Sequence, residues 1–124
     1  TTTALATRAL LGELKDGASA ELEAAVRKGA AFLGSAQHED GGIGPRFDQA
    51  TMIGHAHALR ALVEIGLRFP DAVRKEQVER AVAFALRARN PYRGWRYAIT
   101  PDGDNDSKIT AAMLLALHAV ERMG

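Results

Sequence analysis

The feature that most restricts the fold of this sequence is a pattern of apolar and amphipathic segments that recurs about every 50 residues. A shift of about 52 positions aligns Lys28 with Arg80, Phe32 with Phe84, Gly42 with Gly94 and Ile43 with Trp95. A slightly longer shift brings Ala61-Leu62 onto Ala116-Leu117. A fixed period of this size is typical of stacked helical repeats, in which each unit packs on its neighbours. We therefore expect an all-α architecture.

Five segments carry helical spacing, and they alternate between two kinds. Residues 3–14, 52–67 and 109–123 are apolar around most of the circumference. The two segments between them each carry one apolar stripe, formed by Leu22, Ala25, Val26, Gly29, Leu33 and Ala36 in the first and by Val78, Ala81, Val82, Ala85 and Leu86 in the second. Helices that are apolar on most sides are normally buried on most sides. The sequence therefore predicts inner apolar helices that alternate with outer amphipathic ones.

Local signals set the ends of the two amphipathic segments. Ser19 is a candidate N-cap of the first, and the loop sequence from His38 to Gly42 follows it. Pro70 and Asp71 precede the second, and Asn90-Pro91 ends it. Residues 95–99 alternate in polarity but lie between two prolines, so we interpret them as an extended loop.

Composition removes several classes of function. The 124 residues suit about one domain, and 16 basic against 15 acidic residues give a net charge of +1. This balance does not favour a nucleic-acid partner. The absence of cysteine excludes disulfides, thiolate zinc sites and a cysteine nucleophile. No segment has the length of a membrane span or the form of a signal peptide, so we expect a soluble protein whose location the sequence does not indicate.

The loop after the first amphipathic segment carries the most specific motif. Lys28, Gly29, Phe32, Leu33, Gln37 and Gly41 occupy the basic, small, aromatic, aliphatic, Gln and Gly positions of a spaced pattern whose last position, usually Trp, is Ile43. This resembles the glutamine–tryptophan repeat of squalene and oxidosqualene cyclases. Residues 52–59 and 94–107 resemble bacterial proteins with prenyltransferase and squalene-oxidase repeats.

The resemblance implies an α/α toroid of concentric inner and outer helices, as in terpene cyclases and protein-prenyltransferase β subunits. Residues 1–124 would form one α/α-repeat domain of about two and a half units. Both ends of the pattern are apolar, whereas terminal repeats normally carry polar caps. We therefore expect a part of a larger toroid or an oligomer. The loop residues Gln37, Gly41, Gly42, Gly94 and Trp95 are expected to hold the repeat together.

The acidic stretch before the last apolar segment allows three interpretations. Asp104 or Asp106 could cap the helix that follows. Asp102, Asp104 and Asp106 also have the 1, 3, 5 spacing of a calcium loop, although Ser107 stands where that loop has Gly and Met113 where it has Glu. Through the resemblance, Asp104 would be the acid of a class II terpene cyclase and Asp102 its neighbour, although the third Asp of that motif is missing.

Two histidines and two aromatic residues are the other candidate ligand contacts. His55 and His57 are two residues apart on one helix, so they point in different directions and cannot share a metal ion. We expect one of them to be structural and the other to face a cavity. Trp95 and Tyr97 are the aromatic candidates. The resemblance implies that prenyl transfer needs a cysteine zinc ligand, so the absence of cysteine argues against that activity. Apart from the calcium interpretation of the acidic stretch, we expect no metal and no cofactor.

These observations favour a non-catalytic α/α-repeat module with a binding or assembly role. Its expected partners are a hydrophobic small molecule, a protein segment or a second copy of the chain. The alternative is part of a terpene-cyclase-like enzyme with Asp104 as general acid. Aromatic residues are only 6% of the chain, which argues against a cavity that stabilises carbocations.

Overall fold

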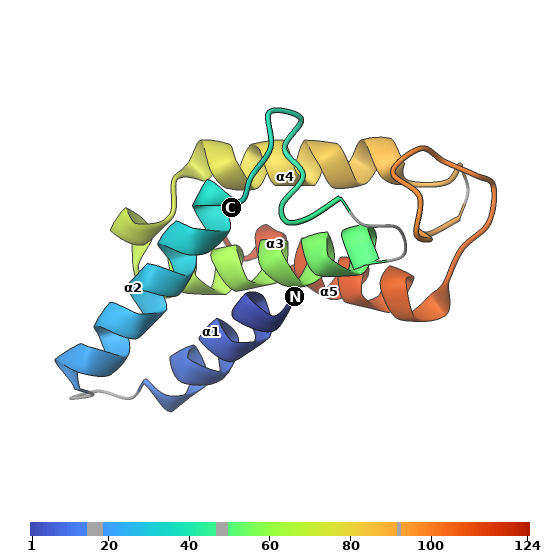
Figure 1. Cartoon of the computed structure of the whole chain (residues 1–124). Helices are drawn as coiled ribbons and strands as arrows, with labels where there is room; N and C mark the ends of the chain where they lie inside the picture. The colour runs from blue at the N-terminus through green and yellow to red at the C-terminus, as the bar shows by residue number, and fades with distance from the viewer. Residues whose placement is uncertain (15–18, 47–49, 92) are drawn as a thin grey trace.

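The computed structural model describes residues 1–14, 19–46, 50–91 and 93–124 of the chain (Figure 1). Its helices, in chain order, are α1 (Thr2–Glu13), α2 (Ala20–Ser35), α3 (Thr51–Arg68), the 3-10 helix η2 (Pro70–Ala72), α4 (Lys75–Ala88) and α5 (Ser107–Glu121). No strand occurs in these described ranges, and residues 95–99 form an irregular segment. The prediction of an all-α fold with five α-helices is confirmed.

The middle helix of the chain, α3, organises the fold (Figure 1). It contacts α1, α2, α4 and α5. Two buried clusters lie around it. The larger joins α3 to α1, α2, the first half of α4 and the second half of α5, and it includes Val26, Leu59 and Leu62. The smaller joins the start of α3 to α4, the segment after α4 and the start of α5, and it includes Met52, Phe84 and Trp95.

Caps and turns explain where the helices begin. The Ser19 hydroxyl accepts a hydrogen bond from the Leu22 N–H, which confirms the predicted N-cap of α2. Pro70 and Asp71 do not begin α4 itself, because they form η2 and α4 starts only after Arg74. There the Gln77 side chain accepts the Arg74 N–H at 3.0 Å.

The expectation that all three apolar helices are buried on most sides is correct for α3 and wrong for α1 and α5. Most of α3 is buried, whereas α1 exposes Leu5 and Leu10 and α5 exposes Leu114 and Leu115. The reason is position, since α3 has an apolar helix on each flank and α1 and α5 each have one on a single flank. Within the described residues, no helix combines the length and the apolar character that a membrane crossing needs.

Candidate functional site

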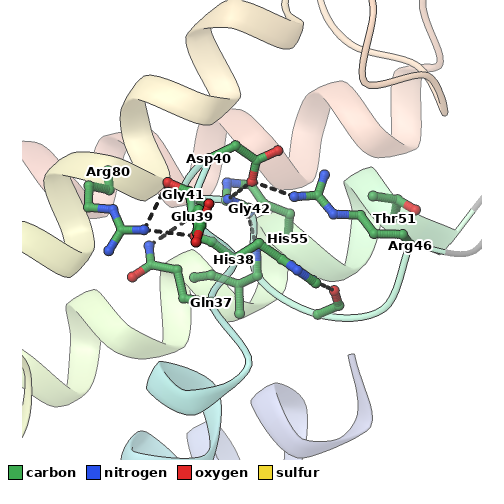
Figure 2. A network of polar contacts seen from close by, with 12 residues as sticks. Gln37, His38, Glu39, Asp40, Gly41, Gly42, Arg46, Thr51, His55 and Arg80 are labelled. Atoms are coloured by element: carbon green, nitrogen blue, oxygen red, sulfur yellow. Dashed lines mark hydrogen bonds and ion pairs between the residues drawn. The ribbon is translucent and has the colours of Figure 1, made fainter.

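The Gly-rich segment of residues 37–46, which we call the first repeat loop, is fastened to α4 (Figure 2). The Gln37 side-chain amide donates to the carbonyl of Gly41 at 3.1 Å and to that of Gln77 at 2.9 Å. In the opposite direction, the Arg80 guanidinium on α4 donates to the loop carbonyls of His38 and Glu39. Gly41 has a φ of +94° and lies directly against the Arg80 backbone. The predicted structural role of Gln37 and Gly41 agrees with this geometry.

His55 joins this loop to two helices. It is fully buried on α3, where its Nδ1 accepts the Ile43 N–H at 3.1 Å. Its Nε2 therefore carries the proton and donates to the Ala81 carbonyl at 3.0 Å. Burial lowers the pKa of His55 to about 4, so the ring is neutral. Both ring nitrogens are used inside the protein, so His55 is not available to a ligand.

Phe84 on α4 is covered by the first repeat loop. Gly42 contacts its ring, the Arg46 guanidinium lies 4.9 Å from the ring centroid, and the His55 ring lies 4.7 Å away on α3. Asp40 holds Arg46 in place through an ion pair. Burial acts to raise the pKa of Asp40, but the hydrogen bonds from the Gly42 N–H and Arg46 outweigh it and lower that pKa.

The second repeat loop, residues 93–106, repeats this arrangement with different side chains. The Trp95 N–H donates to the Thr110 hydroxyl at 3.0 Å, as the Ile43 N–H donates to His55. The Trp95 indole N–H then donates to the Ala85 carbonyl at 2.7 Å, near the end of α4. Thr110 is thus the counterpart of His55 on the next apolar helix. Trp95 is buried, so it supports the repeat and does not face a ligand.

We expect Thr110→Val to lower the free energy of unfolding by about 1–3 kcal/mol, since it leaves the Trp95 N–H without its acceptor. Thr110→Ser keeps the hydroxyl and is the matched control, with a smaller loss. Urea unfolding followed by circular dichroism measures the difference. Equal stability of the valine and serine variants would show that this hydrogen bond does not support the repeat.

Asn90 organises the acidic stretch, a role that the sequence around it did not predict. Its side chain is buried, and its carbonyl oxygen accepts the N–H groups of Asp102 and Gly103 at 2.8 and 2.9 Å. Its amide donates to the Asp102 carboxylate and the Asp104 carbonyl. The sequence showed Asn90 only as a helix stop, because its partners lie more than ten residues away.

The three candidate carboxylates do not converge on one point, because Asp106 caps a helix whereas Asp102 and Asp104 lie beside Arg96. Asp106 caps α5 by accepting the Ile109 N–H at 3.0 Å, which confirms one of the predicted caps. Asp104 and Asp102 lie 3.3 and 3.9 Å from the Arg96 guanidinium. Across the described ranges, no three carboxylate or histidine side chains are grouped closely enough to hold a metal ion. Asp104 is exposed and paired with a cation, whereas a cyclase acid must be enclosed to stay neutral.

His57 lies in a different environment from His55. It is half-buried on α3, and burial and the neighbouring cations Arg8, Arg60 and Lys108 lower its pKa. Arg8 and Arg60 both bind Glu64, at 2.6 and 2.9 Å. His57 therefore lies on the same polar face of α3 as Arg60 and Glu64. Tyr97 is half-buried, with the Arg96 guanidinium 5.2 Å from its ring centroid.

Two hollows in the described surface are apolar. The first, of about 370 Å³, lies between the start of α1 and the end of α2, and Phe32, Leu33 and Ile43 line it. The second, of about 600 Å³, is a groove along α4 and the end of α5, and we call it the α4 groove. Its apolar walls include Val78, Val82, Leu86, Val120 and Met123. Volumes of this order are typical of sites for small ligands.

Comparison with family models, with curated proteins and with solved structures finds no match to this chain.

Proposed function

We propose that this chain is a non-catalytic α/α-repeat module that binds an apolar ligand or protein segment in the α4 groove. The observation that carries the proposal is that three of the polar candidates are engaged in holding the repeats, while an apolar groove stays open. His55, Trp95 and Asp106 all bind backbone groups of the chain itself. The resemblance of the repeat loops to those of terpene cyclases and prenyltransferases supports the α/α-repeat part of the proposal.

The groove has the composition that an apolar ligand needs. Val78, Val82 and Leu86 follow one another at four-residue spacing along α4, so their side chains share one face. Leu86 is 53% exposed, and its burial by a ligand would remove apolar surface from water. Lys75 and Glu79 also line the groove, but both are exposed and they form an ion pair with each other at 3.7 Å.

Titration with the uncharged apolar dye Nile red tests the binding role. We expect saturable fluorescence enhancement by the folded chain, and Leu86→Lys should weaken it several-fold. Leu67→Lys changes another exposed leucine outside the groove and is the matched control. Equal dye binding by both variants would contradict binding in this groove.

A turnover assay separates the module from the enzyme alternative. The parent chain and the Asp104→Asn variant are incubated with squalene and its epoxide, and the products are analysed by mass spectrometry. The non-catalytic proposal predicts no cyclised product from either chain. Cyclisation by the parent that Asp104→Asn abolishes would establish Asp104 as a general acid and overturn the proposal.

A further inference from the structure

Charged side chains from three helices gather on one face of α3, and we call them the α3 cationic cluster. The cluster consists of Arg8 on α1, His57, Arg60 and Glu64 on α3, and Lys108 on α5. Positions 57, 60 and 64 are three and four residues apart, so their side chains share one face of the helix. Helix α3 contacts both α1 and α5. The cations of all three helices therefore lie close enough to His57 to add to the effect of burial on its pKa.

The single carboxylate of the cluster is shared by two guanidinium groups. Arg8 Nε lies 2.6 Å from the Glu64 carboxylate, and Arg60 Nε lies 2.9 Å from it. Burial acts to raise the pKa of Glu64, but the hydrogen bonds from the two arginines outweigh it and lower that pKa, so Glu64 is charged at neutral pH. The three side chains are only 21–28% exposed. Two cations are thus held in place with one negative charge between them.

Further donors of the α3 cationic cluster have no acceptor within the part of the chain that the structure describes. There, Lys108 forms no ion pair, and neither ring nitrogen of His57 forms a hydrogen bond. Because the pKa of His57 is lowered, its ring is neutral at pH 7 and has one N–H to donate. Arg60 binds Glu64 through Nε, so its terminal nitrogens can donate elsewhere. Three side-chain cations against one carboxylate give the cluster a formal charge of +2.

Other arginines of this chain are better compensated. Arg27 has two carboxylate partners, Glu23 and Asp71, and Arg46 has Asp40 for itself. A partly buried positive charge that lacks a partner costs stability, because burial removes water that would solvate it. A bound anion would remove this cost in the α3 cationic cluster.

We infer that the α3 cationic cluster binds a phosphate group. At pH 7 such a group carries a charge near −2 and three acceptor oxygens, which match the formal charge and the free donors of the cluster. A single carboxylate would leave half of the positive charge uncompensated. The donors come from three helices and reach the anion from different directions, which suits a tetrahedral group. None of these residues lines the α4 groove, so this site is separate from the proposed apolar one.

Proton NMR of the His57 ring in the whole chain, at pH 7 and low ionic strength, tests the site. His57→Gln assigns the signal. A bound dianion favours the imidazolium, so inorganic phosphate should move the signal saturably toward its protonated position, with a Kd of about 1 mM. Sodium chloride at the same ionic strength should not. Phenyl phosphate distinguishes two sources of the group, since tighter binding than that of inorganic phosphate indicates a larger phosphorylated molecule and weaker binding the free ion.

Three substitutions that each remove one positive charge complete the test. Lys108→Gln, at an exposed position where folding should persist, and Arg60→Gln should each weaken phosphate binding about fivefold or more. Arg93→Gln removes an exposed charge from the second repeat loop and should change the Kd by less than about twofold. A shift that does not saturate, a shift that chloride reproduces, or a Kd that Lys108→Gln leaves unchanged would each overturn the inference. Nile red reports on the α4 groove, so the two proposals can fail separately.

Discussion

Gly41→Ala should lower the free energy of unfolding by about 3 kcal/mol, one of the two largest effects expected for this chain. Gly41 has a φ of +94°, which costs a residue with a Cβ about 1 kcal/mol. A Cβ at this position would also overlap the Arg80 carbonyl, whose carbon atom would lie 2.7 Å away. Overpacking against backbone that cannot give way typically adds about 2 kcal/mol.

Gly44→Ala is the matched control for this substitution. Gly44 also has a positive φ, of +101°, but a Cβ there meets no heavy atom within 4 Å. It should therefore lose only the conformational part, about 1 kcal/mol. Urea unfolding of both variants and the wild type gives the comparison. Equal losses at the two glycines would show that the close approach of the first repeat loop to α4 does not limit stability.

The overlap at Gly41 also explains what the loop motif does in this chain. Gln37 can bind the carbonyl of Gln77 on α4 only if the loop backbone comes close to that helix. Gly41 permits this approach, and the Arg80 guanidinium on α4 adds hydrogen bonds to two carbonyls of the loop. The spacing of the motif is therefore a requirement of packing between consecutive repeats.

Sequence periodicity predicted the helices well because each segment carries its own pattern. The stripe from Leu22 to Ala36 and the largely apolar composition of residues 52–67 are local properties, and the structure has α2 and α3 there. Exposure of α1 and α5 could not be predicted in the same way. The exposure of a helix depends on how many other helices pack against it, and its own composition does not indicate how many do.

The sites were harder to predict for a related reason. His55 and Thr110 do the same work, yet one is an imidazole and the other a hydroxyl, so residue type alone hides their equivalence. The longer repeat shift that aligns Ala61 with Ala116 also aligns His55 with Thr110, and this was the available signal. Asn90 gave no comparable signal, because the four hydrogen bonds of its side chain reach a loop whose path is set by tertiary structure.

The second large effect is a loss of stability in mild acid that comes from His55. Its pKa is about 4 in the folded chain and 6.5 when unfolded, because burial disfavours the charged ring. Between these values the unfolded chain binds more protons, so stability is full above pH 6.5 and falls as the pH drops toward 4. The whole difference corresponds to about 3 kcal/mol, and the loss between pH 7 and pH 5 to about 2 kcal/mol.

Protonation has a specific structural consequence at this residue. A charged ring has a proton on Nδ1, so it can no longer accept the Ile43 N–H and would leave that donor unpaired inside the protein. The first repeat loop should therefore separate from α3 before the helices themselves unfold. Amide hydrogen exchange of Ile43 should accelerate at pH 5 by more than that of Trp95, after correction for intrinsic rates, because Trp95 is bound to a hydroxyl that does not titrate in this range.

Three histidine variants assign the acid sensitivity to its source, with urea unfolding at pH 7 and pH 5 as the measurement. His55→Gln should be less stable than the wild type at pH 7 and should lose most of the pH dependence. His118→Gln, at an exposed position, should keep all of it. The pKa of His57 is also lowered, by burial and by Arg8, so His57→Gln should remove only a minor part of the pH dependence.

Asp40 and Glu64 also lower the stability as the pH falls, but they do so at lower pH, since their pKa values are lowered from already acidic ones. A His55→Gln variant that retains the full loss between pH 7 and pH 5 would show that the loop contact does not carry it.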